Sequence, residues 1–302
     1  MTGPALAGTW FVLPTPFDRD GAIDLRSQRR LVEATLGWGV DGLTAMGVTS
    51  EATELSSDER SDALRAVADS IGGRVPLVVG CSGGDAGSVV ELIREAAAAG
   101  ALAAMITAPP GIGDIDRVPR FFAQVARDGG LPIVIQDEPA ATGVRLPVDT
   151  LLRSLEAAGS RTVKLEDPPT APKIASLLDS DPDVAVFGGL GGAAALWELR
   201  HGASGTMTGF AFPEVLRALR KRVEDGDGAE AGLLFDRYLP VIQFEAQPGI
   251  GLAVRKELLR RRGAIDTAVT RRGTRLDPVT SRELDDTLRR VGVEPGWEPL
   301  EV

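Results

Sequence analysis

The chain of 302 residues is long enough for two average domains or for one α/β barrel, and its 43% hydrophobic and 25% charged residues are ordinary for a globular protein. The net charge of −10 argues against nucleic acid and against anionic membrane surfaces as partners. A single cysteine, Cys81, excludes an internal disulfide and fits a reducing compartment, so we expect a cytoplasmic protein.

Targeting and membrane signals are missing from the sequence. Residues 1–8 have neither a charged start nor a long apolar run, so we expect no signal peptide. No run reaches about 18 apolar residues, so we expect no membrane span. The lone histidine, His201, ends a predicted helix, where histidine usually caps, and one histidine rules out a His-rich metal site.

Short apolar strands alternate with amphipathic helices along most of the chain. Eight such units over about 225 residues match the span of a (β/α)8 barrel. The predicted strands are 9–14, 42–47, 76–81, 102–108, 132–137, 162–167, 184–188 and 205–209, and the predicted helices are 25–38, 56–71, 85–99, 117–128, 147–158, 171–179, 193–200 and 213–224.

A doubly wound sheet is the rival fold, and its usual signature is a G-x-G-x-x-G loop after the first strand. The first strand here ends in Leu13-Pro14-Thr15-Pro16-Phe17, without such a loop. The glycine-rich stretch 188–192 comes instead at the seventh strand, where a tight turn or an anion cradle are both open. After residue 225 the alternation stops, and 229–245, 249–262 and 280–291 are predicted helices. We therefore predict an α/β fold, a (β/α)8 TIM barrel over 1–225 with three additional C-terminal helices in a 226–302 extension of the same domain.

Lys164 is the most informative residue. The alternation in its strand directs Thr162, Lys164 and Glu166 to one face and Val163 and Leu165 to the other. If the apolar face packs on helices, Lys164 points into the barrel, where burial lowers the pKa of an amine and makes it a Schiff-base candidate. The alternative is a purely structural pair with Glu166.

The other three of the four lysines, Lys173, Lys221 and Lys256, fall in charge-rich, helix-like stretches. There we expect solvated ammonium groups, none of them placed to form an imine.

In a (β/α)8 barrel the chemistry lies at the carboxyl ends of the strands. The second strand ends in Gly47-Val48-Thr49-Ser50-Glu51, and the sixth contains Lys164. A lysine facing a hydroxyl-bearing loop is typical of a site for a 2-oxo acid: the amine forms an imine with the keto carbon, and backbone N–H groups and hydroxyls hold the adjacent carboxylate.

With these motifs the chain resembles the dihydrodipicolinate synthase / N-acetylneuraminate lyase family of class I aldolases. The resemblance covers essentially the whole chain and rests on residues 13–17, 47–55, 163–166 and 202–205. The family's second-strand signature, G-T-T-G-E, is altered here, because Val48 replaces the first threonine and Ser50 the glycine, while Thr49 is retained.

Departures from the family pattern bear on the activity. The fifth-strand motif Y-N-x-P-x-R-T-G aligns with 136–143, which places Gln136 at the proton-relaying tyrosine and Ala141 at the arginine that binds a second carboxylate. The tyrosine that reaches across the family's dimer aligns with Pro109-Pro110, and Tyr238 lies in the C-terminal helices. Glutamine does not titrate, so synthase activity of the usual type is not expected.

The resemblance is nearer to the branch of 2-keto-3-deoxy sugar acid dehydratases, on the residues Gln136, Asp137, Lys164, Glu166 and the 205–209 stretch. In that branch the imine acidifies C3 and the C4 hydroxyl is expelled as water. We therefore expect a Schiff-base-forming lyase that dehydrates a 2-keto-3-deoxy sugar acid. A pyruvate-dependent aldolase or hydratase-aldolase, and a non-catalytic oxo-acid-binding barrel, stay open as alternatives.

The expected site residues fall into two groups. The catalytic candidates are Lys164, Glu166 and Thr49, and the substrate-binding candidates are Gln136, Val48, Ser50, Gly189 and Thr208. Purely structural roles stay open as alternatives: Thr49 can cap its own loop, Gln136 can fill the barrel interior, and Asp137 and Glu138 can simply solvate the loop after the fifth strand.

Met46, Met105 and Met207 are expected to fill the barrel. No metal is required, no cofactor motif is present, and the partner is a small-molecule 2-oxo acid. The resemblance further implies a homo-oligomer, a dimer or tetramer.

Overall fold

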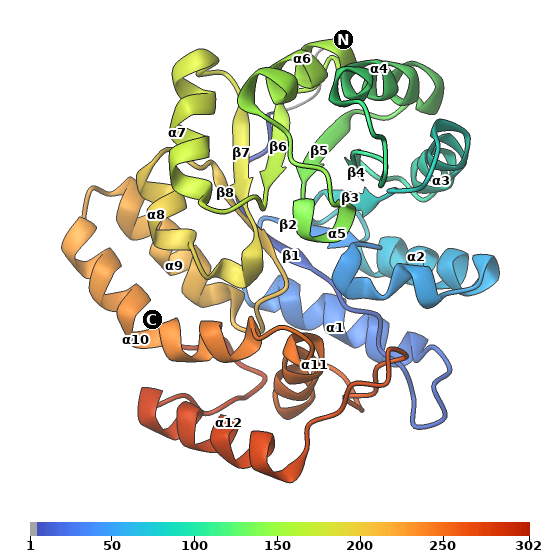
Figure 1. The fold of residues 1–302 in the computed structure, drawn as a ribbon. Coiled ribbons are helices and arrows are strands. Elements are labelled where there is room, and N and C mark those ends of the chain that lie inside the picture. Colours follow the sequence, from blue (N-terminus) through green and yellow to red (C-terminus); the bar gives the residue numbers. More distant parts are fainter. Residues whose placement is uncertain (1–4) are drawn as a thin grey trace.

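The computed structural model describes residues 5–302, and their eight parallel strands close into a barrel. Each strand pairs with the next along the chain, and β8 pairs with β1 (Figure 1). Residues 1–4, part of the stretch for which no signal peptide is expected, lie outside the described residues. The strands are β1 Gly8–Val12, β2 Gly42–Ala45, β3 Leu77–Gly80, β4 Ala103–Thr107, β5 Ile133–Asp137, β6 Thr162–Leu165, β7 Ala185–Gly188 and β8 Gly205–Thr208.

Helices follow the strands and form the outer ring, so the predicted TIM barrel is confirmed. The ring helices are α1 Leu25–Gly37, α2 Ser57–Ile71, α3 Ala86–Ala98, α4 Val118–Gly129, the short α5 Pro139–Thr142, α6 Val148–Ala158, α7 Thr170–Ser180, α8 Ala195–Arg200 and α9 Pro213–Glu224. The additional helices are α10 Gly228–Glu245, α11 Gly251–Arg261 and α12 Pro278–Val291. None of the helices described is both long and apolar enough to cross a membrane.

Two apolar clusters divide the barrel wall between its faces. The larger one joins outward side chains such as Val163 and Leu165 to the surrounding helices. The smaller one fills the lumen and includes Trp10, Phe187 and Met207, with the Trp10 and Phe187 rings 6.0 Å apart edge to face. The lumen is therefore a packed core, and only its carboxyl end is left for polar chemistry.

The methionines divide between these clusters. Met105 and Met207 lie in the lumen cluster, as expected for barrel filling. Met46 belongs to the outer cluster instead. Its backbone is in the left-handed region at φ 56°, where the chain leaves β2 for the next loop.

The C-terminal helices, orange to red in Figure 1, pack beside the barrel, with α10 against α8 and α9. Their apolar residues Phe235, Leu258 and Leu288 belong to the same core as the outer barrel wall. Arg262, directly after α11, has a fully buried side chain that bonds both carboxylate oxygens of Glu214 and stacks on the Trp38 ring at 3.6 Å. This one guanidinium ties the helical extension to α1 and α9.

Replacing Arg262 by Met should lower the free energy of unfolding by roughly 3–5 kcal/mol, because Glu214 would keep a buried charge without its partner. Urea and thermal unfolding measure the loss. The matched control is Arg289→Met on α12, whose side chain is 73% exposed in an ion pair with Asp286, and it should change stability by less than about 1 kcal/mol. Equal stabilities of the two variants would contradict this role of Arg262.

Candidate active site

Lys164 lies on the lumen face of β6, at its carboxyl end. Its strand neighbours in register are Gln136 on β5 and Phe187 on β7. The flanking Val163 and Leu165 are fully buried in the outer cluster, so the predicted alternation holds. The residue is only 6% exposed, and its ammonium therefore depends on nearby protein groups for solvation.

Glu166 supplies that partner. Its Oε2 lies 3.0 Å from Lys164 Nζ, and its Oε1 accepts a hydrogen bond of 3.1 Å from the backbone N–H of Leu190. Gly189 makes room for this carboxylate, since a Cβ there would lie 2.1 Å from Glu166 Oε1. Gly189 thus leaves the space that the Glu166 side chain occupies, and its part in substrate binding stays a proposal.

Gln136 joins two carboxylates in the lumen. Its Nε2 donates to Glu166 Oε2 at 2.7 Å and to Glu138 Oε2 at 2.6 Å. The amide group is therefore engaged with protein carboxylates, which limits what it can offer a substrate directly. Lys164, Glu166, Gln136 and Glu138 form one connected group, called the lysine cluster below.

Glu138 is the member of the lysine cluster that the sequence analysis missed. Burial raises the pKa of this carboxyl to about 7, the neighbouring Glu166 charge adds to the rise, and Lys164 opposes it. The alternation of β5, continued one step past the strand end, would have placed Glu138 on the face of Gln136.

Asp137 points the other way. It is fully buried on the outer face of β5, where Lys173 Nζ of α7 lies 2.6 Å from its Oδ2 and 3.0 Å from Asp167 Oδ2. Burial raises the Asp137 pKa against the opposing effect of Lys173. Asp137 is therefore not a solvated loop residue, whereas Glu138 is half-buried and bonds Gln136.

The three candidate residues in the loop after β2, namely Val48, Thr49 and Ser50, differ in exposure and in hydrogen bonding. Ser50 is 1% exposed, its Oγ donates to Leu13 O at 2.5 Å, and its N–H donates to Gly47 O at 2.9 Å. Both of its donors thus hold the loop, and its expected role in substrate binding stays a proposal. Thr49 Oγ1 is buried without a hydrogen-bond partner among the described residues, and Val48 is 43% exposed.

Thr208 does not face the lumen. It is in register with Phe11, which packs in the outer cluster, while the preceding Met207 lies in the lumen cluster. Side chains alternate along a strand, so Thr208 points toward the helices. Its assignment as a substrate-binding residue is corrected by this register.

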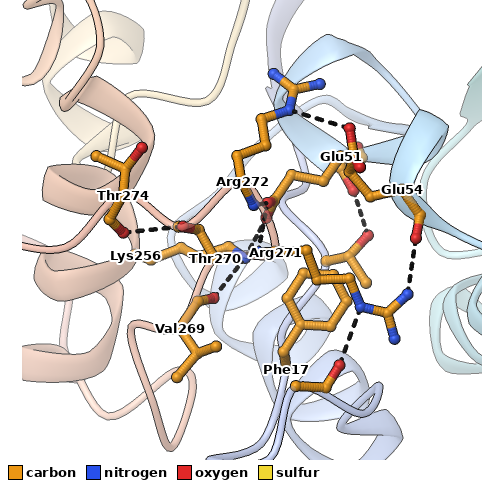
Figure 2. Close-up of polar contacts among 12 residues, drawn as sticks. Phe17, Glu51, Glu54, Lys256, Val269, Thr270, Arg271, Arg272 and Thr274 are labelled. Atoms are coloured by element: carbon orange, nitrogen blue, oxygen red, sulfur yellow. Dashed lines mark hydrogen bonds and ion pairs between the residues drawn. The ribbon is translucent and has the colours of Figure 1, made fainter.

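The other lysines are not the solvated groups that the sequence analysis expects, apart from Lys221, which is 70% exposed beside Asp225. Lys256 has no exposed surface and donates to Glu51 Oε2 at 2.6 Å and to Val269 O at 2.8 Å (Figure 2). Burial lowers the pKa of Lys256 to about 8. A low pKa suits imine chemistry, but this amine is enclosed between α11 and the β2 loop.

Glu51 anchors a larger network around that loop. Its backbone is left-handed at φ 54°, and its Oε1 accepts the N–H groups of Arg271 at 2.8 Å and Arg272 at 3.1 Å (Figure 2). Arg271 also lies over the Phe17 ring at 4.5 Å. The segment between α11 and α12 is thereby fixed to the loop that carries Thr49.

Two cavities open beside the lysine cluster. One, of about 590 Å³, is lined by Val48, Met105 and Gln136 among others. The second, of about 640 Å³, is lined by Thr49, Leu190 and Arg255 among others, and Arg272 lines both. Gln136 brings the first cavity against the cluster, and Leu190, whose N–H bonds Glu166, does so for the second, whereas Lys164 itself lines neither of the two.

Comparisons with known proteins show the family to which the chain belongs. The model of the Dihydrodipicolinate synthetase family matches residues 5–289. A 4-hydroxy-tetrahydrodipicolinate synthase of Xanthomonas axonopodis pv. citri (strain 306) is 32% identical over 93% of this chain and 99% of its own. An L-2-keto-3-deoxyarabonate dehydratase of Azospirillum brasilense is 33% identical over 95% of each chain.

Among solved structures, a dihydrodipicolinate synthase from Rhodopseudomonas palustris superposes with a TM-score of 0.90 at 31% identity, covering 95% of this chain and 98% of that one. The match spans the barrel, the lysine strand and most of the C-terminal helices. The chain therefore belongs to the dihydrodipicolinate synthetase family, the Schiff-base-forming lyases of the class I aldolase type.

Proposed function

We propose that this lyase dehydrates a 2-keto-3-deoxy sugar acid through an imine on Lys164. The observation that carries the proposal is the lysine cluster: one buried amine lies against Glu166, and a glutamine amide connects Glu166 to Glu138. Similarity to the Azospirillum brasilense L-2-keto-3-deoxyarabonate dehydratase adds support.

The first step uses the amine together with Glu166. Neutral Lys164 attacks the C2 carbonyl of the 2-oxo acid, and the carbinolamine that forms receives one proton from Glu166, so that its hydroxyl leaves as water and a protonated imine remains. Glu166, 3.0 Å from Nζ, can take the proton that the amine must lose and then stabilise the cationic imine.

Elimination then needs a base at C3 and an acid at C4. Glu166 is the proposed base, because its Oε1 is fixed by the Leu190 N–H and its Oε2 faces the imine nitrogen. Glu138 is the proposed acid: with a pKa of about 7 it holds a proton in a large fraction of molecules near neutral pH. Its proton leaves with the C4 hydroxyl as water, and hydrolysis of the imine releases the dehydrated oxo acid.

Gln136 is a positioning residue in this mechanism, since its amide does not titrate but holds both carboxylates by hydrogen bonds. Thr49 lines the larger cavity, and its buried hydroxyl, which has no partner among the described residues, makes it a proposed substrate ligand. We also propose that Val48 and the backbone N–H groups of this loop bind the substrate carboxylate next to the imine.

Aldol cleavage is the second candidate, because most of the similar proteins are synthases that act through the same fold. Gln136 and Ala141 weigh against it, since a titrating relay and a carboxylate-binding arginine are both replaced there. Free pyruvate among the products would signal C–C cleavage, whereas an oxo acid of unchanged carbon number would signal loss of water. A homo-oligomer and a cytoplasmic location likewise remain proposals.

Replacing Lys164 by Met should abolish adduct formation when pyruvate or a 2-keto-3-deoxypentonate is reduced onto the protein with borohydride. Turnover of the sugar acid should fall by at least about a thousandfold, because the electron sink is lost. Peptide mass spectrometry locates the adduct. The control is Lys221→Met, which removes an exposed amine and should keep the Lys164 adduct. Full turnover in the Lys164 variant would reject the imine mechanism.

The pH dependence should report Glu138. An acid works only while protonated, so turnover should be maximal below pH 7 on this limb and should fall as the pH rises through about 7. In Glu138→Gln this limb should disappear and the maximal rate should drop by about 10²–10⁴-fold. Asp149→Asn, which changes an exposed carboxylate, is the control. An unchanged pH profile in Glu138→Gln would exclude Glu138 as the acid.

A further inference from the structure

We propose that Arg255 and Arg272 form a second subsite at the barrel mouth, which binds a carboxylate at the far end of the substrate. The substrate would then be a dicarboxylic 2-oxo acid, with C2 at Lys164 and its terminal carboxylate at the two guanidinium groups. This inference rests on the proposed imine function and names the substrate class of that site.

Arg255 reaches the mouth from α11. Its side chain is 7% exposed, and its Nε donates to Glu245 Oε1 at 2.6 Å. The guanidinium occupies the space beside Gly209, where a Cβ would lie 2.6 Å from Arg255 Nη1. Gly209 directly follows β8, two residues after the lumen-facing Met207, so the guanidinium lies over the lumen side of the barrel end.

One donor of this guanidinium is unused. Arg255 Nη1 is buried and has no hydrogen-bond partner among residues 5–302, although the side chain lines the larger cavity. A buried cationic donor without an acceptor costs free energy, which a ligand carboxylate would recover. Glu245 cannot serve twice, because its other oxygen accepts the Ala211 N–H at 2.9 Å.

Arg272 supplies the second cation. Its backbone is fixed through the N–H bond to Glu51, while its side chain is 41% exposed and lies 3.8 Å from Glu54, a loose surface pair (Figure 2). The side chain lines both cavities beside the lysine cluster. It can therefore turn toward a ligand without breaking the loop.

The charge of the subsite matches one carboxylate. Glu245 compensates Arg255, so the surplus on the wall of the larger cavity is the single positive charge of Arg272. A monoanion fits this surplus better than a phosphate dianion does. Thr49, Thr270 and Gln243 line the same cavity and can bind hydroxyls between the two carboxylates.

The subsite adjoins the imine lysine. Leu190 lines the larger cavity, and its N–H donates to Glu166, which in turn contacts Lys164 Nζ. One carboxylate thus separates the cavity wall from the amine. In this proposal the substrate chain starts at Lys164, passes Thr49 and ends at Arg255, both of which line the larger cavity.

The test is the concentration dependence of borohydride-trapped imine on Lys164. The probes are 2-oxoglutarate and 2-oxoadipate, each against the monoacid of equal length, 2-oxopentanoate and 2-oxohexanoate, with pyruvate as the reference. The native protein should half-saturate with at least one diacid at a roughly tenfold lower concentration than with its matched monoacid, the effect of one charge-assisted pair.

Four variants test whether the preference for the diacid depends on Arg255 and Arg272. It should fall toward unity in Arg272→Gln, and also in the double variant Arg255→Met with Glu245→Gln, which leaves no unpaired buried carboxylate. Glu245→Gln alone keeps Arg255 and should keep the preference for the diacid. Arg260→Gln removes an exposed arginine of the same helix and controls for net charge.

The outcomes separate the two proposals. Pyruvate adducts on Lys164 without any preference for a diacid, or a preference that survives in Arg272→Gln and in the double variant, would overturn the subsite while leaving the imine function intact. Absence of an adduct from every oxo acid would overturn the imine function itself. Arg272→Gln alters a partly exposed side chain and should fold normally, so the test stands even where the double variant does not fold.

Discussion

The whole site depends on keeping an amine in a lumen that is otherwise packed with apolar side chains. Trp10, Phe187 and Met207 fill the barrel below Lys164, so water cannot solvate the amine from that side. Glu166 contacts the amine directly, and Glu138 adds a second carboxylate to the same group. Burial raises the pKa of Glu138, and the nearby Glu166 charge adds to the rise. Proton donors near neutral pH arise here from crowding of like charges and from burial.

Gln136 shows how a non-titrating side chain can support proton chemistry. A tyrosine at this position would donate one hydrogen bond and could pass a proton. The glutamine amide carries two N–H groups, and both carboxylates lie within 2.7 Å of its nitrogen. It therefore holds Glu138 and Glu166 by hydrogen bonds at a fixed separation, and in the proposed mechanism the proton moves through the carboxylates. In the proposed mechanism, two carboxylates joined by this amide take the place of the tyrosine that the family pattern has on the fifth strand.

Local periodicity explains what could be predicted from the sequence. Alternation around Lys164 correctly placed Lys164 and Glu166 in the lumen, and the eight strand–helix units predicted the barrel. The same rule, applied at β5 and β8, would have placed Glu138 in the site and turned Thr208 away from it, because Met207 was already expected to fill the barrel. Partners far apart in the chain were out of reach: Lys256 and Glu51 are separated by 205 residues, and Arg255 and Gly209 meet only in the closed fold. Such contacts leave no periodic signal in a single sequence.

These long-range contacts join the C-terminal helices to the loops at the barrel mouth, where the proposed site lies. Arg255 and Lys256 are neighbours on α11, so they leave the helix in different directions. Lys256 reaches Glu51 and fixes the loop that carries Thr49, whereas Arg255 reaches the end of β8. A shift of α11 would therefore move two walls of the larger cavity together. Arg262, at the end of the same helix, holds it against Glu214 and Trp38 of the barrel's outer ring. The buried ion pair between Arg262 and Glu214, which lies outside the proposed site, thus anchors α11. Since α11 supplies Arg255 to the wall of the larger cavity, this anchor helps to set the shape of that cavity.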